Sequence, residues 1–252
     1  MQPTLEIGPI TLQTFGICFA LGFVASGALL ARRLRELGRP SDWAYEMIFS
    51  ALVGGLVGSR IDYLIQNFSA VQDDLVGALF SGSGLVWFGG LVGGAAGVLI
   101  WARLRGYLGL QLLDVCAPAL ALGYAVGRVG CQLSGDGDYG VESDLPWAMS
   151  YPEGTVPTAP GEEVHPTPVY ETLAMGLAAL LLWRLRDRFR PGSLFALYLL
   201  ISGVERFLIE IIRRNDSVVV GLTLAQLISI GLVVVSAAIL ARPGALSPAR
   251  AT

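Results

Sequence analysis

The sequence contains seven apolar stretches, each about 20 residues long, which is the length that a helix needs to cross a bilayer. They span residues 12–31, 44–65, 84–102, 112–131, 168–185, 193–212 and 222–241. Of the 252 residues, 54% are hydrophobic and only 15% are charged, a fraction well below that of soluble domains. The sequence therefore predicts an all-α polytopic membrane protein with seven transmembrane helices, in which residues 1–252 form a single integral membrane domain.

Glycines repeat at four-residue spacing within three of these stretches. The pairs are Gly54 and Gly58, Gly89 and Gly93, and Gly123 and Gly127. Small residues at this spacing lie on one helix face and allow two helices to approach closely in lipid. We therefore expect these glycines to form contacts between helices.

The positions of the arginines predict the orientation of the chain. Twelve of the 17 basic residues, all arginines, follow the first, third, fifth and seventh stretches. Because positive residues accumulate on the cytoplasmic side, the N-terminus is expected outside and the C-terminus inside. Residues 132–167 contain several acids and no arginine, which predicts a periplasmic loop insertion. A formal net charge of −3 and the lack of a basic stripe argue against nucleic-acid binding.

Arg60, Arg128 and Arg206 lie inside apolar stretches, toward their outer halves. On insertion scales, an arginine at the centre of a membrane helix costs roughly 2.5–3.5 kcal/mol, so each needs compensation. One interpretation is a set of buried ion pairs with acids such as Glu171 and Glu210, the latter four residues from Arg206 on one helix face. The other is a shared site for an anion, and a phospholipid phosphate suits bidentate arginine contacts.

The segment GRVGCQLSGDGDYG, residues 127–140, is the densest group of polar residues near a predicted membrane boundary. Its glycines allow tight turns and close approach of a ligand. Asp136 and Asp138 supply too few oxygen ligands for a calcium loop, so no metal site is predicted. Whether these two acids bind a cation or only shape the turn stays open at this point.

Several further motifs, spread in order along nearly the whole chain, match those of a known family when they are taken together. They are GSRIDYLI (58–65), GLVWFGGLVGG (84–94), DVCAPALALGYAVGRVGC (114–131), HPTPVYE (165–171) and GVERFLIEIIRRND (203–216). In combination they resemble the prolipoprotein diacylglyceryl transferase family. The resemblance implies seven spans and transfer of the diacylglyceryl group of phosphatidylglycerol to the lipobox cysteine thiol of a prolipoprotein. The product is a thioether, and glycerol phosphate is released.

The resemblance also implies the partners and the site residues. The partners are phosphatidylglycerol, a prolipoprotein signal peptide with its lipobox cysteine, and the lipid of a bacterial inner membrane, with no cofactor. Arg128 and Arg206 match essential arginines of the family, and we expect them to be catalytic together with His165. The expected substrate-binding residues are Arg60, Cys131, Ser134, Asp136, Tyr139, Gly140, Tyr170, Glu171 and Glu210.

The chain also departs from the family pattern. The histidine that usually precedes the glycine pair of the third stretch is Phe88, which cannot accept a proton. The other changed positions are Phe15, Cys131, Ser134 and Ser202. His165, the only histidine, is either a replacement base or a structural cap of the turn that follows it. Cys131 is either a nucleophile that carries lipid or a small polar filler.

Two other functions fit the same residues. A divergent paralogue would act on another lipid or acceptor, and a non-enzymatic phospholipid-binding protein would keep the phosphate site without the chemistry. A small-solute transporter fits less well, because transporters place their charges near the midplane beside broken helices. In this sequence the charges gather toward one face.

Overall fold

The computed structural model describes residues 1–71, 77 and 86–247, so the first two residues of the stretch 84–102, and Arg250, lie outside the described residues. The chain divides into two compact units. Unit 1 contains Met1–Leu29 and Leu113–Thr252, and unit 2 contains Leu30–Leu112. The prediction of a single integral membrane domain stays a prediction.

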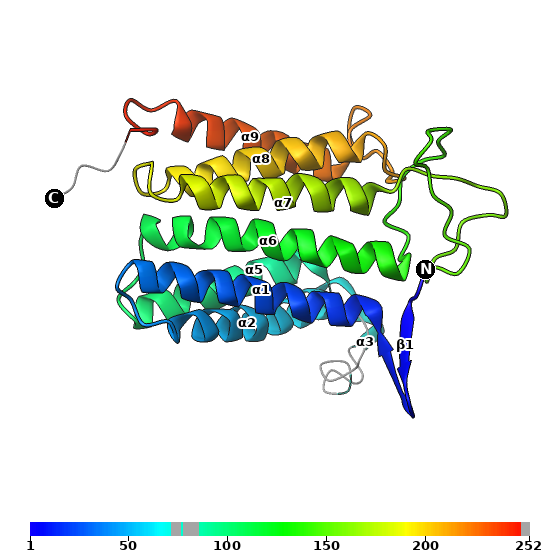
Figure 1. Ribbon diagram of the computed structural model, residues 1–252, viewed down its shortest axis with the longest axis horizontal. Helices are drawn as coiled ribbons and strands as arrows, with labels where there is room; N and C mark the ends of the chain where they lie inside the picture. The colour runs from blue at the N-terminus through cyan, green and yellow to red at the C-terminus, as the bar shows by residue number, and fades with distance from the viewer. Residues whose placement is uncertain (72–76, 78–85, 248–252) are drawn as a thin grey trace. The chain divides into compact units, whose positions relative to one another are not determined.

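Each predicted apolar stretch coincides with a helix. The helices are α1 (Thr14–Glu36), α2 (Trp43–Gln66), α5 (Trp87–Leu104), α6 (Leu110–Ser134), α7 (Thr167–Leu185), α8 (Ser193–Glu210) and α9 (Leu224–Leu240) (Figure 1). Among the described helices, α1, α2 and α6 are long and apolar enough to cross a membrane, and α5 and α9 are shorter apolar helices. The protein is therefore mainly helical with membrane-embedded helices, and the count of seven spans stays a prediction.

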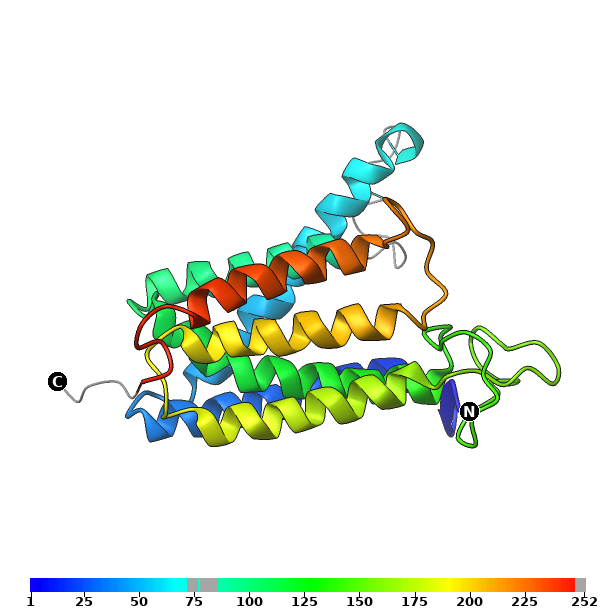
Figure 2. The same cartoon turned by 90° about the horizontal axis from the view of Figure 1, so that it is seen from above.

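In unit 1, helices α6, α7 and α8 lie side by side around a core of small and apolar side chains (Figures 1 and 2). Helix α6 contributes buried alanines, and α7 contributes Met175 and Leu182, both nearly inaccessible to solvent. The first part of α1 packs on α6, where the Ser26 hydroxyl donates to the Ala119 carbonyl at 2.8 Å. Small side chains at these contacts let the helices approach closely, as expected for helix pairs in lipid.

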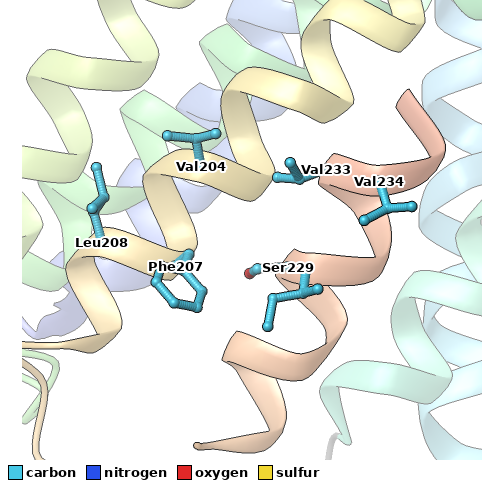
Figure 3. A pocket seen from close by; sticks show the side chains of 7 residues that line it. Val204, Phe207, Leu208, Ser229, Val233 and Val234 are labelled. Atoms are coloured by element: carbon cyan, nitrogen blue, oxygen red, sulfur yellow. The ribbon is translucent and has the colours of Figure 1, made fainter. Parts of the chain in front are cut away.

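Helix α9 packs against α8 and begins with a capping box. The Thr223 side chain accepts from the Gln226 amide at 3.2 Å, and the Gln226 side chain accepts from the Thr223 amide at 3.0 Å. An apolar pocket of about 240 Å³ lies between the two helices, lined by residues such as Phe207 of α8 and Val233 of α9 (Figure 3). Because no charged side chain lines this pocket, it does not suit a phosphate headgroup.

An N-terminal β-hairpin, which the sequence analysis did not predict, precedes α1. Strands β1 (Thr4–Ile7) and β2 (Ile10–Gln13) are antiparallel. The backbone amide of Gln2 donates to the Leu133 carbonyl at 3.0 Å, which ties this segment to the end of α6. The hairpin therefore lies at the same end of unit 1 as the loop that follows α6.

The predicted loop 132–167 begins later than expected and ends earlier, because α6 continues to Ser134 and α7 begins at Thr167. Gly135 ends α6 with a φ of 58°, a left-handed conformation that glycine adopts without strain. Within the loop, Tyr139 stacks on Tyr151 with ring centroids 4.8 Å apart, next to the inaccessible Val164. The loop thus has a small core of its own, and its periplasmic location stays a prediction.

Unit 2 contains α2, the short helix α3 (Phe68–Val71) and α5. The glycine faces of α2 and α5 contact each other: a Cβ atom added to Gly58 would lie 2.8 Å from the Cα atom of Gly93. The expected glycine contacts are confirmed for Gly54, Gly58, Gly89 and Gly93.

The third glycine pair behaves differently. Gly123 faces Gly22 and Ser26 of α1 within unit 1, so its predicted contact is confirmed. Among the described residues, a Cβ atom added to Gly127 would meet nothing within 4 Å, so the prediction of a close helix contact is wrong for Gly127. Spacing alone did not separate these two positions, because it does not reveal which face of a helix has a neighbour.

Candidate functional site

Three arginines of unit 1 surround the carboxylate of Glu171, which lies near the start of α7 and is fully buried. Its Oε1 atom lies 3.2 Å from Nη2 of Arg128, 3.6 Å from Nη1 of Arg206 and 3.7 Å from Nη1 of Arg213. The Tyr124 hydroxyl donates to the same oxygen at 2.7 Å. A single carboxylate oxygen therefore connects α6, α7, α8 and the segment after α8.

Two further carboxylates complete the ion pairs of this arginine cluster, which consists of Arg128, Arg206 and Arg213. Asp138 pairs with both Arg128 and Arg213. Glu210 pairs with Arg206 across one helical turn, with 2.7 Å between Nη2 and Oε2. Three carboxylates thus oppose three guanidinium groups, so the predicted Arg–Glu pairs that lock the helices together are present.

The cluster is buried on one side and accessible on the other. The side chain of Glu171 is inaccessible and that of Glu210 is 1% exposed, whereas Arg206 is 26% exposed and Asp138 is 31% exposed. An anion that enters from the accessible side would therefore meet Arg206 and Asp138 first. Exchange of the Asp138 carboxylate for the incoming anion would leave the buried Glu171 pairs in place.

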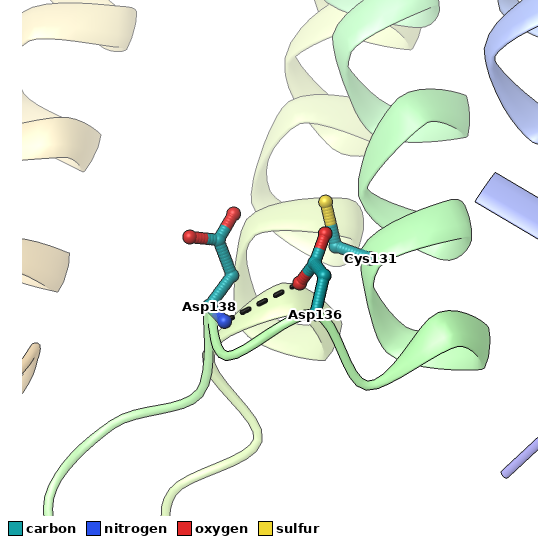
Figure 4. A group of neighbouring side chains, drawn as sticks. All are labelled: Cys131, Asp136 and Asp138. Atoms are coloured by element: carbon teal, nitrogen blue, oxygen red, sulfur yellow. Dashed lines mark hydrogen bonds between the residues drawn. The ribbon is translucent and has the colours of Figure 1, made fainter. Parts of the chain in front are cut away.

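Glycines place Asp138 against the arginines. Gly135 and Gly137 have φ values of 58° and 92°, so the chain turns sharply after α6 and returns Asp138 to the helix end. The Asp138 amide donates to Oδ1 of Asp136 at 3.3 Å (Figure 4). The Thr167 hydroxyl donates to the Asp138 carbonyl. The turn is therefore held from both sides.

The two loop acids have different protonation behaviour. Burial raises the pKa of Asp138, but the charges of Arg128 and Arg213 outweigh that effect and hold the pKa below its usual value. Burial raises the pKa of Asp136, and the hydrogen bond from the Cys131 thiol opposes this only in part. Asp138 is therefore the acid that stays ionised to hold the arginines.

Cys131, Asp136 and Asp138 bring three potential ligand atoms within 4.8 Å of one another (Figure 4). Asp138 already bonds two guanidinium groups, and their charge opposes a further cation at this carboxylate. The Arg128 Nη1 atom also lies 3.7 Å from the Cys131 sulfur. The cluster is thus better explained as the support of Arg128 than as a cation site.

His165 belongs to a different set of contacts in the described part of the chain. Its Nδ1 atom lies 3.4 Å from the Tyr170 hydroxyl, which also accepts from Nε1 of Trp147 at 2.7 Å. The Trp147 side chain is more than half exposed. His165 and Tyr170 are therefore joined to each other and to an exposed aromatic residue, and the role of His165 as a base stays a prediction.

Other predicted site residues form internal contacts of the loop and its junction with α6. The Ser134 hydroxyl donates to the Cys131 carbonyl at 3.3 Å, and the Tyr139 hydroxyl donates to the Val156 carbonyl at 3.1 Å. Gly140 has no room for a side chain, because an added Cβ atom would lie 2.9 Å from Cβ of His165. These residues shape the loop, and direct contact with substrate stays a prediction for each of them.

A family model described as prolipoprotein diacylglyceryl transferase matches residues 2–242 of this chain. The chain belongs to the prolipoprotein diacylglyceryl transferase family. Its members are transferases, so the protein is an enzyme by family. The family resemblance found in the sequence is therefore confirmed.

Three relatives, each a phosphatidylglycerol–prolipoprotein diacylglyceryl transferase, illustrate the similarity. The protein of Clostridium tetani (strain Massachusetts / E88) is 31% identical over 218 residues, which cover 85% of this chain and 86% of the relative. The protein of Methylococcus capsulatus is 31% identical over 221 residues, or 84% of this chain and 81% of the relative. The protein of Chromohalobacter salexigens is 32% identical over 217 residues, or 84% and 79%.

Two residues that the expected site did not include, Arg213 and Glu205, belong to the arginine cluster or interact with it. Arg213 lies at the predicted outer end of the stretch 193–212, against the rule that places basic residues on the cytoplasmic side, and this exception is the signal that could have identified it. Glu205 of α8 lies next to Arg206 in the sequence and is 9% exposed. An acid inside an apolar stretch is by default a functional candidate, and this rule could have identified Glu205.

Arg60 and Phe88 lie in unit 2. Arg60 is half-buried on α2, and Phe88 is 44% exposed at the start of α5. The substrate-binding role of Arg60 stays a prediction. A phenylalanine at position 88 cannot accept a proton.

Proposed function

We propose that this protein transfers the diacylglyceryl group of phosphatidylglycerol to the lipobox cysteine thiol of a prolipoprotein in a bacterial inner membrane. Its relatives carry the name of this reaction. The observation that supports the proposal most directly is the convergence of Arg128, Arg206 and Arg213 on one carboxylate oxygen. A phosphodiester headgroup is the substrate part that three converging guanidinium groups suit best.

The proposed reaction places growing negative charge on the phosphate. The thiol sulfur attacks the glyceryl carbon that bears the phosphate, the carbon–oxygen bond breaks, and glycerol phosphate leaves with the bonding electrons. Guanidinium groups already held in place stabilise that charge as it develops. Glu171 holds Arg128, Arg206 and Arg213 from the buried side, and the phosphate takes the place of Asp138 on the accessible side.

The contacts of His165 support a role near the acceptor peptide. Tyr170 bonds both His165 and Trp147, and the exposed ring of Trp147 offers an apolar surface. We propose that these three side chains contact the lipobox segment. The proposed orientation, with residues 135–166 on the periplasmic side, would bring secreted precursors to this surface.

The proposal is tested with purified protein, labelled phosphatidylglycerol and a lipobox peptide. We expect release of glycerol phosphate, and a drop of about 10²–10³ in kcat for Arg128→Ala and for Arg206→Ala, the usual loss for one donor that stabilises an oxyanion. Arg184→Ala, an exposed arginine near the end of α7, is the matched control. Release of no glycerol phosphate by the wild type would favour a lipid-binding protein, and full activity of both site variants would refute the assigned site.

A further inference from the structure

Glu205 is a buried acid next to the arginine cluster, and it has no role in the reaction proposed above. It lies on α8 with 9% of its surface exposed. Its Oε1 atom is buried and has no hydrogen-bond partner among the described residues. It interacts electrostatically with Glu171 of α7, Arg128 of α6 and Arg206 of its own helix. An unpartnered carboxyl oxygen beside three guanidinium groups calls for a functional explanation.

Glu205 differs from the three acids paired with the arginine cluster because it forms no ion pair in the part of the chain that the structure describes. Asp138, Glu171 and Glu210 each pair with at least one arginine, so a proton added to any of them would weaken an ion pair that positions the phosphate site. Within the described residues, no ion pair at or below 4.0 Å involves Glu205. Among these four acids, Glu205 is therefore the one that can gain or lose a proton while the arginines stay in place. Asp136 of the loop also has no ion pair with another described residue, but it is hydrogen-bonded to the Cys131 thiol.

The surroundings of Glu205 are otherwise poor in groups that exchange protons. Tyr198 and Glu205 lie on one face of α8, and Tyr198 packs against the alanine core. Tyr124 of α6 and Arg213 of the segment after α8 also interact electrostatically with Glu205. Helix α9 carries no ionisable side chain. The nearby carboxylates of Glu171 and Glu210 are ion-paired with arginines, which disfavours their protonation relative to that of Glu205.

We propose that Glu205 accepts the proton of the acceptor thiol during diacylglyceryl transfer, an inference that rests on the proposed function. As the sulfur–carbon bond forms, the S–H bond gives its proton to the Glu205 carboxylate, while the electrons of the broken carbon–oxygen bond stay on the phosphate. The proton then passes to the released glycerol phosphate or to water. Glu205 thus accepts the proton that a phenylalanine at position 88 cannot accept. The only histidine of the chain, His165, contacts Tyr170 instead.

The test is the pH profile of kcat/KM for the variant Glu205→Gln. Glutamine keeps the shape of the side chain and removes the carboxylate that accepts the proton. At pH 7 we expect a loss of about 10²–10⁴, the usual contribution of a positioned base. The thiolate fraction of a free cysteine rises about tenfold per pH unit up to its pKa near 8.5, so activity of the variant should recover steeply over that range. A peptide with selenocysteine in place of the lipobox cysteine ionises without a base and should restore activity at pH 7.

Two controls separate this role from others. Glu163→Gln removes an exposed acid of the loop and should leave the profile unchanged. Glu205→Asp keeps the carboxyl group and should keep the wild-type pH profile at reduced rate, which preserves the test if Glu205→Gln fails to fold. Wild-type protein that releases no glycerol phosphate would instead refute the proposed function.

Three results would overturn the inference while the transferase activity stands. The first is activity of Glu205→Gln within a few-fold of wild type at pH 7. The second is a loss that is equal at every pH and is not relieved by the selenol peptide, which would indicate a structural role. The third is a kcat/KM of His165→Gln that rises steeply with pH and is restored at pH 7 by the selenocysteine peptide, while Glu205→Gln keeps the wild-type pH profile.

Discussion

The Glu171→Gln variant tests how much the buried carboxylate contributes to the stability of unit 1. Glutamine keeps the size of the side chain and can still accept from Tyr124, but it removes the charge that three arginines share. Removing one partner of a buried ion pair costs about 3–5 kcal/mol. Arg128 keeps Asp138 and Arg206 keeps Glu210, so we expect a value near the lower end, about 3 kcal/mol.

The assay is thermal unfolding of the purified protein in detergent at pH 7. For chains of about this length, 1 kcal/mol corresponds to roughly 2–4 °C, so Tm should fall by about 6–12 °C. The matched control is Glu162→Gln, which removes an acid of the loop paired with the partly exposed Arg214. Solvent screens such a pair, so Tm of the control should stay close to wild type. A Glu171→Gln Tm equal to that of the control would refute the reasoning.

Two other variants, at Asp138 and at Gly58, give three further predictions. Asp138→Asn removes the carboxylate that competes with a phosphate for the arginines. Calorimetry should therefore show that glycerol phosphate binds about tenfold more tightly, a gain of about 1.4 kcal/mol in binding free energy. Weaker binding would contradict the proposal that a phosphate replaces Asp138 at the arginines. The pKa of Asp138 is lower in the folded protein than in the unfolded chain. The ionised carboxylate therefore stabilises the fold fully above about pH 4, and this stabilisation is lost as the pH falls through the folded-state pKa. In acid, the Tm of the wild type should therefore fall more steeply than that of Asp138→Asn. Gly58→Ala should destabilise unit 2 by about 1–3 kcal/mol in chemical unfolding, because the added Cβ atom meets Gly93, whereas Gly176→Ala, with open space around it, should not.

The helices could be predicted from the sequence because apolar length is a local property. Each expected stretch became a helix whose ends differ by a few residues, and the charge pattern of α8 placed Arg206 and Glu210 on one face. The hairpin before α1 was missed, although Gly8 and Pro9 separate two short alternating segments. Each strand has only four residues, and the second one overlaps the start of the apolar stretch 12–31, so the helical pattern dominates this part of the sequence.

The arginine cluster could be predicted only in part because it depends on contacts distant in the sequence. Asp138 and Arg213 are 75 residues apart, and no periodicity within one helix reveals such a pair. The single-helix pattern also could not show that Glu171 would meet arginines from three elements. Arg213 lies just outside the stretch 193–212, where a charged residue needs no partner within the membrane, so its place in the cluster was not predicted.

The shared Glu171 carboxylate also has a consequence for biogenesis. Ribosomes make α6 first, so Arg128 enters the bilayer before any of its helical partners has been synthesised. Arg128 first gains the counter-charge of Asp138 from the loop after α6 and then that of Glu171 when α7 emerges, whereas Arg206 arrives with α8 and Arg213 directly after it. The ion pairs of the cluster are therefore complete only after α8 and the segment that follows it have been synthesised, and a chain truncated before α8 leaves Glu171 without two of its three arginines.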